Sequence, residues 1–205
     1  MRVLVGPRVE LGSDRVAADV AHALAGPEGS VVPLVEIGVR NLNRPVTAAE
    51  VALLRRALPA EDGLVGYICR GRPVGPGAEG QTEAVSCIGA VTSEVQAVVV
   101  TDHANLTWRS PLTGPNDDQA GPRFPSMTGI YACEAALDSL KALDGIIVRS
   151  GVVAGVSDDA RPTAFEVEVA GTRGHVAVSS ELAPVAIVAA HMGLRVAAVV
   201  LMVGS

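Results

Sequence analysis

Two adjacent residues, Asp102 and His103, have the side chains of an acid–base pair. A carboxylate beside an imidazole is a frequent arrangement for general acid–base catalysis. The two residues follow the apolar run Ala97 to Thr101, which predicts a strand, and neighbours on a strand point to opposite faces. This alternation favours a structural role for the pair over a catalytic one.

Glu181 and Arg72 form a second candidate pair. Glu181 lies between an apolar strand-like run and the start of a helix, which favours a pocket over the surface. Arg72 lies in a glycine-rich segment, where it is either an anion ligand or a solvated arginine. A carboxylate that faces an arginine across an apolar cavity has a perturbed pKa, a mark of functional sites. We take Glu181, Arg72 and the adjacent Ser180 as the catalytic candidates.

The cysteines and histidines carry weaker signals. Cys87 has no partner base that the sequence reveals, and a buried, inert thiol is the default for such a residue. The 3 cysteines and 4 histidines lack CxxC, HExxH or other ligand spacing. We therefore expect no metal site, no cofactor and no disulfide, in keeping with a cytoplasmic protein.

The elements that position these residues alternate between strands and helices, which predicts an α/β fold. Ser13 or Asp14 can cap the first helix, and Thr47 with Glu50 predicts a capping box for the second. Long segments without periodicity, such as residues 102–128, usually carry function or an interface. Strands are predicted over 2–5, 31–36, 64–69, 97–101, 145–154, 175–179 and 194–203, helices over 15–24, 47–58, 129–143, from 163 and over 184–191, and irregular segments over 71–80, 102–128 and 156–162.

Length and composition indicate one domain over residues 1–205, long enough for a substantial core. Hydrophobic residues make up 49% of the chain, and the mean hydropathy is +0.37. No apolar run reaches the ~18 residues of a membrane span. The apolar surplus therefore predicts a large sheet core and an oligomer interface. The net charge of −6 and the 2% of aromatic residues argue against nucleic acid or anionic membranes as partners.

Three stretches carry motifs whose order and spacing are specific. They are Thr101 to Asp117 (TDHANL, then PLTGPND), Pro122 to Tyr131 (PRFPSM, then Y) and Pro184 to Val196 (PVAIVAAHMGLRV). In these stretches the chain resembles the trimeric class of purine nucleoside and methylthioadenosine phosphorylases, over roughly residues 60–204. The resemblance implies an α/β fold with a twisted mixed sheet, partly closed and flanked by helices. It also implies a small-molecule substrate and a homo-oligomer, either a trimer or a hexamer.

Several phosphate-binding positions of that family are changed in this chain. The Gly-Ser-Gly loop reads Gly6-Pro7-Arg8-Val9, in which proline removes an N–H donor. Arg72 matches a phosphate-binding arginine, and residues 87–89 match loosely a loop whose N–H groups face phosphate. Ser180 replaces a methionine under the sugar, and Glu181 replaces a phosphate-binding serine. A carboxylate at that position repels phosphate by ~1–4 kcal/mol at short range.

The base-binding positions are changed as well. Pro162 falls where the family has its base-binding glutamate, and Arg161 falls on a stacking phenylalanine. The last strand ends in Gly204, where the family has a purine-contacting asparagine. Trp108 is expected to form a pocket wall or a subunit contact, and Phe124 matches a residue that reaches the neighbouring subunit's site. The expected substrate-binding residues are therefore Trp108, Phe124, Cys87, Ile88, Gly89, Arg161 and Met202.

These changes predict a purine nucleoside phosphorylase-like protein repurposed as a small-molecule enzyme of secondary metabolism. A cyclase, isomerase or lyase acting on a neutral or cationic, fairly apolar molecule needs mainly shaping and polarisation of its substrate. One alternative is an active phosphorylase or hydrolase whose missing groups come from Asp158, Asp159 or Arg8. Another is a non-catalytic subunit that completes the oligomer of an active homologue.

Overall fold

A computed structural model describes residues 1–40, 42, 46–58, 63–74, 96–157, 169, 171–172 and 174–202 of the chain. Its strands and helices alternate along the sequence, as the pattern predicts. The strands are β1 (Arg2–Val5), β2 (Ser30–Pro33), β3 (Leu64–Pro73), β4 (Ala97–Asn105), β5 (Val148–Gly155), β6 (His175–Ser179) and β7 (Arg195–Met202). The helices are α1 (Arg15–Ala25), α2 (Ala48–Ala57), α3 (Cys133–Leu140) and α5 (Leu182–His191).

The strands form one mixed sheet that closes on itself. Its order is β2-β1-β3-β6-β5-β4-β7, and β7 pairs also with β3. Strands β3, β6, β5, β4 and β7 therefore make a ring, from which β1 and β2 extend as an open edge. The β3–β6 and β4–β7 pairs are antiparallel, whereas the other pairs are parallel. The expected twisted, partly closed mixed sheet with flanking helices is confirmed.

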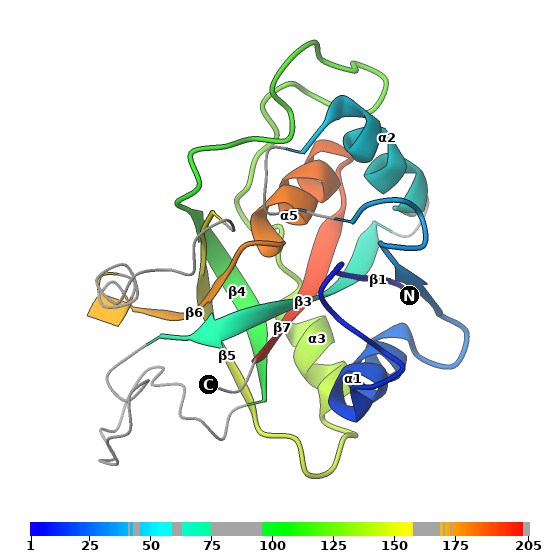
Figure 1. The fold of residues 1–205 in the computed structure, drawn as a ribbon, viewed down its shortest axis with the longest axis vertical. Helices are drawn as coiled ribbons and strands as arrows, with labels where there is room; N and C mark the ends of the chain where they lie inside the picture. Colours follow the sequence, from blue (N-terminus) through cyan, green and yellow to red (C-terminus); the bar gives the residue numbers. More distant parts are fainter. Residues whose placement is uncertain are drawn as a thin grey trace.

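Helices cover the sheet on two sides (Figure 1). Helices α1 and α3 contact each other on one side, and α2 contacts α5 on the other. Strand β7 shows why both sides are apolar, because its side chains alternate between them with period 2. Val196, Ala198 and Val200 pack in the core on the side of α2 and α5. Ala197, Val199 and Leu201 pack in the core on the side of α1 and α3.

Local signals start α1 and α2 where the sequence predicts. The Asp14 side chain accepts a hydrogen bond of 3.0 Å from the N–H of Ala17 and caps α1. Thr47 and Glu50 form the predicted capping box of α2, in which the Thr47 N–H donates to Glu50 at 2.9 Å. Helix α5 is buried on nearly all sides, which explains its nearly continuous run of apolar residues before His191.

Tertiary pairing changes the bounds of several elements. Strand β3 runs to Pro73 and β4 to Asn105, into segments expected to be irregular, because β7, β6 and β5 supply hydrogen-bond partners there. Strand β2 ends at Pro33, three residues earlier than predicted, and a turn follows. Helix α3 is shorter than the predicted helix over 129–143, because Tyr131 instead bridges to Val196 of β7. No helix in the described part of the chain is long and apolar enough to cross a membrane.

Candidate functional site

Three segments far apart in the sequence meet at one end of β1, β3 and β6. The loop after β1 carries Gly6 and Arg8, β3 carries Arg70, and the corner between β6 and α5 carries Ser180 and Glu181. Parallel pairing of β1 with β3 places the first two segments side by side, and the N–H of Gly6 donates to Ile68 at 2.7 Å. Antiparallel pairing of β3 with β6 adds the third segment.

Glu181 is the centre of this arrangement. Its side chain is only 1% exposed, yet both carboxylate oxygens accept hydrogen bonds. Oε1 accepts from the backbone N–H of Arg8 at 3.2 Å and from its Nε–H at 3.1 Å. Oε2 accepts from the backbone N–H of Arg70 at 3.2 Å. A buried carboxylate is tolerable only when it is paired and hydrogen-bonded in this way.

The surrounding polar groups extend the network on both sides. The second guanidinium branch of Arg8 donates to the Ser180 hydroxyl at 2.9 Å. The guanidinium of Arg70 forms an ion pair with Asp14, the residue that caps α1. The Tyr67 hydroxyl donates to the backbone carbonyl of Glu181 at 3.2 Å. The contacts thus run from Arg8 to Glu181, from Glu181 to the backbone of Arg70, and from the Arg70 guanidinium to Asp14.

Burial and hydrogen bonding act in opposite directions on Glu181. Burial raises the pKa of the Glu181 carboxyl above its ordinary value and is the larger effect. The Arg8 guanidinium and the N–H groups of Arg8 and Arg70 lower that pKa and offset part of the rise. Burial also raises the pKa of the Tyr67 hydroxyl and of the Cys69 thiol, so both stay protonated at neutral pH.

The raised pKa of Glu181 predicts how stability depends on pH. The unfolded chain loses the Glu181 proton at lower pH than the folded protein does. Between the two pKa values the folded protein therefore binds more protons than the unfolded chain. The contribution of Glu181 to the free energy of unfolding should therefore be greatest below the ordinary carboxyl pKa and fall as the pH rises through the raised value. Urea unfolding of the protein and of Glu181→Gln at a series of pH values isolates this slope by difference. A difference that grows with pH would contradict the sign.

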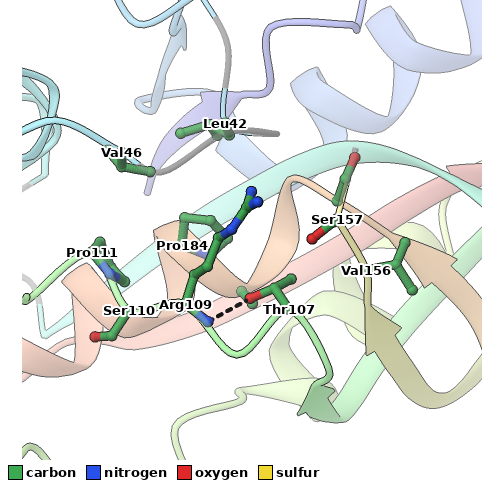
Figure 2. A pocket seen from close by; sticks show the side chains of 11 residues that line it. Leu42, Val46, Thr107, Arg109, Ser110, Pro111, Val156, Ser157 and Pro184 are labelled. Carbon is green, nitrogen blue, oxygen red and sulfur yellow. Dashed lines mark hydrogen bonds between the residues drawn. The ribbon is translucent and has the colours of Figure 1, made fainter. Parts of the chain in front are cut away.

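A small cleft opens beside this network, with a cavity volume of about 30 Å³. Ser180 belongs to both the network and the cleft, because its hydroxyl accepts a hydrogen bond from Arg8 and it also lines the cleft. Figure 2 shows the Arg109 side chain beside Pro184 and Thr107, with its backbone N–H donating to the Thr107 hydroxyl at 3.1 Å. The lining combines hydroxyls, one guanidinium and apolar groups: Leu42, Val46, Thr107, Arg109, Ser110, Pro111, Val156, Ser157, Ser180, Ala183 and Pro184.

The structure changes the expected roles of the catalytic candidates. Glu181 is buried as expected, but its guanidinium partner among the described residues is Arg8, and the N–H partner on β3 is Arg70. Arg72 lies exposed on β3, two residues beyond Arg70. The expectation that Arg72 faces Glu181 is therefore corrected. Of the two adjacent residues Ser180 and Glu181, Ser180 is the one that lines the cleft.

The expected substrate-binding residues are scattered. Trp108 has a positive φ of 55° and is 95% exposed, and Phe124 is 85% exposed beneath the Arg123 guanidinium. Neither side chain lines the cleft of its own chain. Met202 is half-buried at the end of β7 and packs against the core. Cys87, Ile88, Gly89 and Arg161 lie outside the described residues, as do Asp158, Asp159 and Pro162.

Asp102 and His103 have the geometry of a structural pair. The Asp102 carboxylate accepts a hydrogen bond of 2.8 Å from the backbone N–H of His103, not from its ring. The His103 ring instead pairs with the Tyr131 hydroxyl at 2.8 Å, and burial lowers the pKa of His103. The contact with Tyr131 ties the start of the long segment 102–128 to the residues that follow it. Among the described residues, no group of histidine, cysteine and acidic side chains is arranged to hold a metal ion.

Sequence reasoning missed three contributors to the site. The predicted strand ends at Cys69 and leaves Arg70 outside it, although the continuing strand presents the Arg70 N–H to Glu181. Thr107 and Arg109 lie in the long segment whose length alone indicated function. Arg8 lies in the loop that matches the family's phosphate loop and is a substitute group in the alternative of an active enzyme, but the sequence does not predict its pairing with Glu181. The signal for Arg8 is its place after Gly6-Pro7 at the end of a first strand, where a loop can point N–H groups at an anion.

Comparison with known proteins identifies the family. The model of the phosphorylase superfamily matches residues 84–204. Purine nucleoside phosphorylase 1 of Bacillus subtilis is 36% identical over 113 residues, which are 53% of this chain and 42% of that protein. Purine nucleoside phosphorylase 1 of Geobacillus stearothermophilus is 34% identical over 102 residues, 48% of this chain and 37% of that protein. The matches thus span less than half the length of these two relatives.

A solved structure extends the likeness to the amino-terminal part. Isoform 2 of purine nucleoside phosphorylase from Schistosoma mansoni, solved with cytosine and ribose-1-phosphate, superposes with a TM-score of 0.66 at 17% identity. The superposition covers 98% of this chain and 75% of that one, so it shows a shared fold. The family match and the closed mixed sheet agree, and the chain belongs to the phosphorylase superfamily as a relative of its purine nucleoside phosphorylases.

Proposed function

We propose that this chain is a small-molecule enzyme of the phosphorylase fold that does not use phosphate as a co-substrate. One observation carries the proposal: the Glu181 carboxylate accepts the hydrogen bonds of the Arg8 and Arg70 N–H groups and of the Arg8 guanidinium. These donors have the chemistry that a free phosphate requires. A second anion beside Glu181 meets electrostatic repulsion and finds these donors already engaged.

The lining of the cleft supports a substrate that carries hydroxyl or anionic groups. Four hydroxyls (Thr107, Ser110, Ser157 and Ser180) and the Arg109 guanidinium face an otherwise apolar wall, and none of the lining residues that the structure describes is acidic. Ser180 and Arg109 are the residues that we propose to contact the substrate, while Arg8 and Glu181 hold Ser180 in place.

The reaction that we propose is of the cyclase, isomerase or lyase type, within secondary metabolism. It is supported by the absence of a carboxylate or imidazole among the described lining residues, which leaves orientation and polarisation as the available means of catalysis. The proposal includes a cytoplasmic homo-oligomer, a trimer or hexamer. The nearly full exposure of Trp108 and Phe124 supports burial against a second copy, and light scattering in solution measures its size.

A second candidate function is phosphorolysis of purine nucleosides. It is favoured by the two curated relatives, which are more than 30% identical and are named purine nucleoside phosphorylases. In that case groups outside the described residues would supply phosphate binding. The two candidates differ in whether phosphate increases turnover.

The deciding assay follows purine release from inosine and methylthioadenosine, with and without inorganic phosphate. We expect no phosphate-dependent release, under conditions in which the Bacillus subtilis relative serves as the positive control. Phosphate-dependent release by the unaltered chain would overturn the proposal and establish the second candidate. Ser180→Ala and Arg109→Gln then test the cleft, because both should weaken binding of any substrate found by screening hydroxylated or anionic small molecules.

A further inference from the structure

The donors around Glu181 form a complete small-anion site. Two backbone N–H groups, from Arg8 and Arg70, and one Nε–H converge on two oxygens from different directions, at 3.1–3.2 Å. We propose that this is a binding site for a small carboxylate, occupied here by the chain's own Glu181 side chain as a tethered ligand. The site adjoins the cleft at Ser180 but does not depend on the reaction proposed above.

The geometry distinguishes a tethered ligand from an ordinary surface ion pair. Every polar contact to the two carboxylate oxygens that the described residues make is a donated hydrogen bond, which matches the ionised form. The backbone donors are fixed by strand β3 and by the loop after β1, so they remain in place when the side chain is removed. Preorganised donors of this kind cost little reorganisation when an anion binds.

Glycine at position 6 makes room for the anion. A Cβ at Gly6 would lie 2.8 Å from Oε2 of Glu181, which is shorter than the distances at which Cβ atoms contact other atoms in proteins. The absence of a side chain at Gly6 therefore leaves space for this carboxylate oxygen. On the outer side, the Arg8 side chain is 43% exposed, whereas the Glu181 side chain is 1% exposed.

The size of the site selects the ligand class. Glu181→Ala deletes a CH₂–COO⁻ group, which has the shape and charge of acetate. The vacated space and the three donors therefore suit a free monocarboxylate of that size. Inorganic phosphate is bulkier and brings more oxygens than these donors satisfy, so acetate is the expected occupant.

The experiment measures thermal unfolding of Glu181→Ala in sodium acetate and in sodium chloride of equal ionic strength, at a pH near 8. We expect acetate to raise the Tm of this variant by roughly 5–10 °C when its free concentration is a hundredfold above its Kd. Glu181→Gln is the matched control, because the amide fills the same space. It should show the same Tm in both salts, as should the unaltered protein. Adding Arg8→Met to Glu181→Ala should abolish most of the acetate effect.

If Glu181→Ala does not fold in chloride, refolding from urea in acetate replaces the melting curve. A higher yield of folded protein in acetate than in chloride supports the site, and equal yields overturn it. An acetate effect of equal size on Glu181→Gln would also overturn it, because that effect would not arise at the vacated site. Stabilisation by phosphate without stabilisation by acetate would overturn the carboxylate assignment. None of these outcomes depends on whether the unaltered chain cleaves nucleosides.

Discussion

Replacing Arg8 with methionine should lower the free energy of unfolding by about 2–4 kcal/mol. The substitution keeps an apolar stem but removes the guanidinium next to a carboxylate that is 1% exposed. An uncompensated buried charge is costly, and the two backbone N–H donors, which remain, offset only part of the loss. Because the Arg8 side chain itself is partly exposed, we expect the cost to fall short of that for a fully buried pair. Urea unfolding at neutral pH measures the change.

Arg15→Met is the matched control for Arg8→Met. Arg15 pairs with Asp19 one helical turn away on the exposed face of α1, at 3.6 Å. Its loss should cost no more than about 0.5 kcal/mol. The double variant Arg8→Met/Glu181→Gln should recover most of the stability, because no charge is then left buried. Equal costs for Arg8→Met and Arg15→Met would show that Arg8 and Glu181 are not coupled as the structure indicates.

Local signals explain how much of the fold could be predicted. Strand β1, the capped start of α1 and the Thr47–Glu50 capping box are set by neighbouring residues, and all three are confirmed. The outer parts of β3 and β4 could not be predicted in this way. Their polar, glycine-containing ends look irregular, and they become strands because partners distant in sequence supply hydrogen bonds.

The candidate site was predicted only in part for the same reason. The position of Glu181 between an apolar strand and a helix indicated burial, and the side chain is buried. Its partner could not be read from the sequence, because Arg8 lies 173 residues away and Arg70 acts through its backbone N–H. Arg72 carried the resemblance to a phosphate-binding arginine, yet the register of β3 brings the backbone of Arg70 to the carboxylate. The motif match thus led to a residue two positions from the N–H that meets the carboxylate, and an anion-binding role of Arg72 stays a prediction.

Gly6→Ala should destabilise the protein by about 1–3 kcal/mol through overpacking. The added Cβ would lie 2.8 Å from Oε2 of Glu181 and 3.1 Å from both the Ile68 carbonyl oxygen and the Tyr67 hydroxyl. Gly12→Ala is the control, since a Cβ there meets nothing within 4 Å. Its effect should be near zero or slightly stabilising, because alanine restricts the unfolded chain. The free energy of unfolding in urea compares the two variants.

The cost of Gly6→Ala should depend on the Glu181 side chain. In the Glu181→Ala background the shortest contact disappears, and only the two contacts at 3.1 Å remain to be relieved. We therefore expect a coupling free energy of about 0.5–3 kcal/mol between the two positions in a double-mutant cycle. Additive costs would show that glycine serves only the backbone approach of β1 to β3. A positive coupling would show that the Glu181 carboxylate requires glycine at position 6. This is the result expected of a site that is occupied by the chain's own anion.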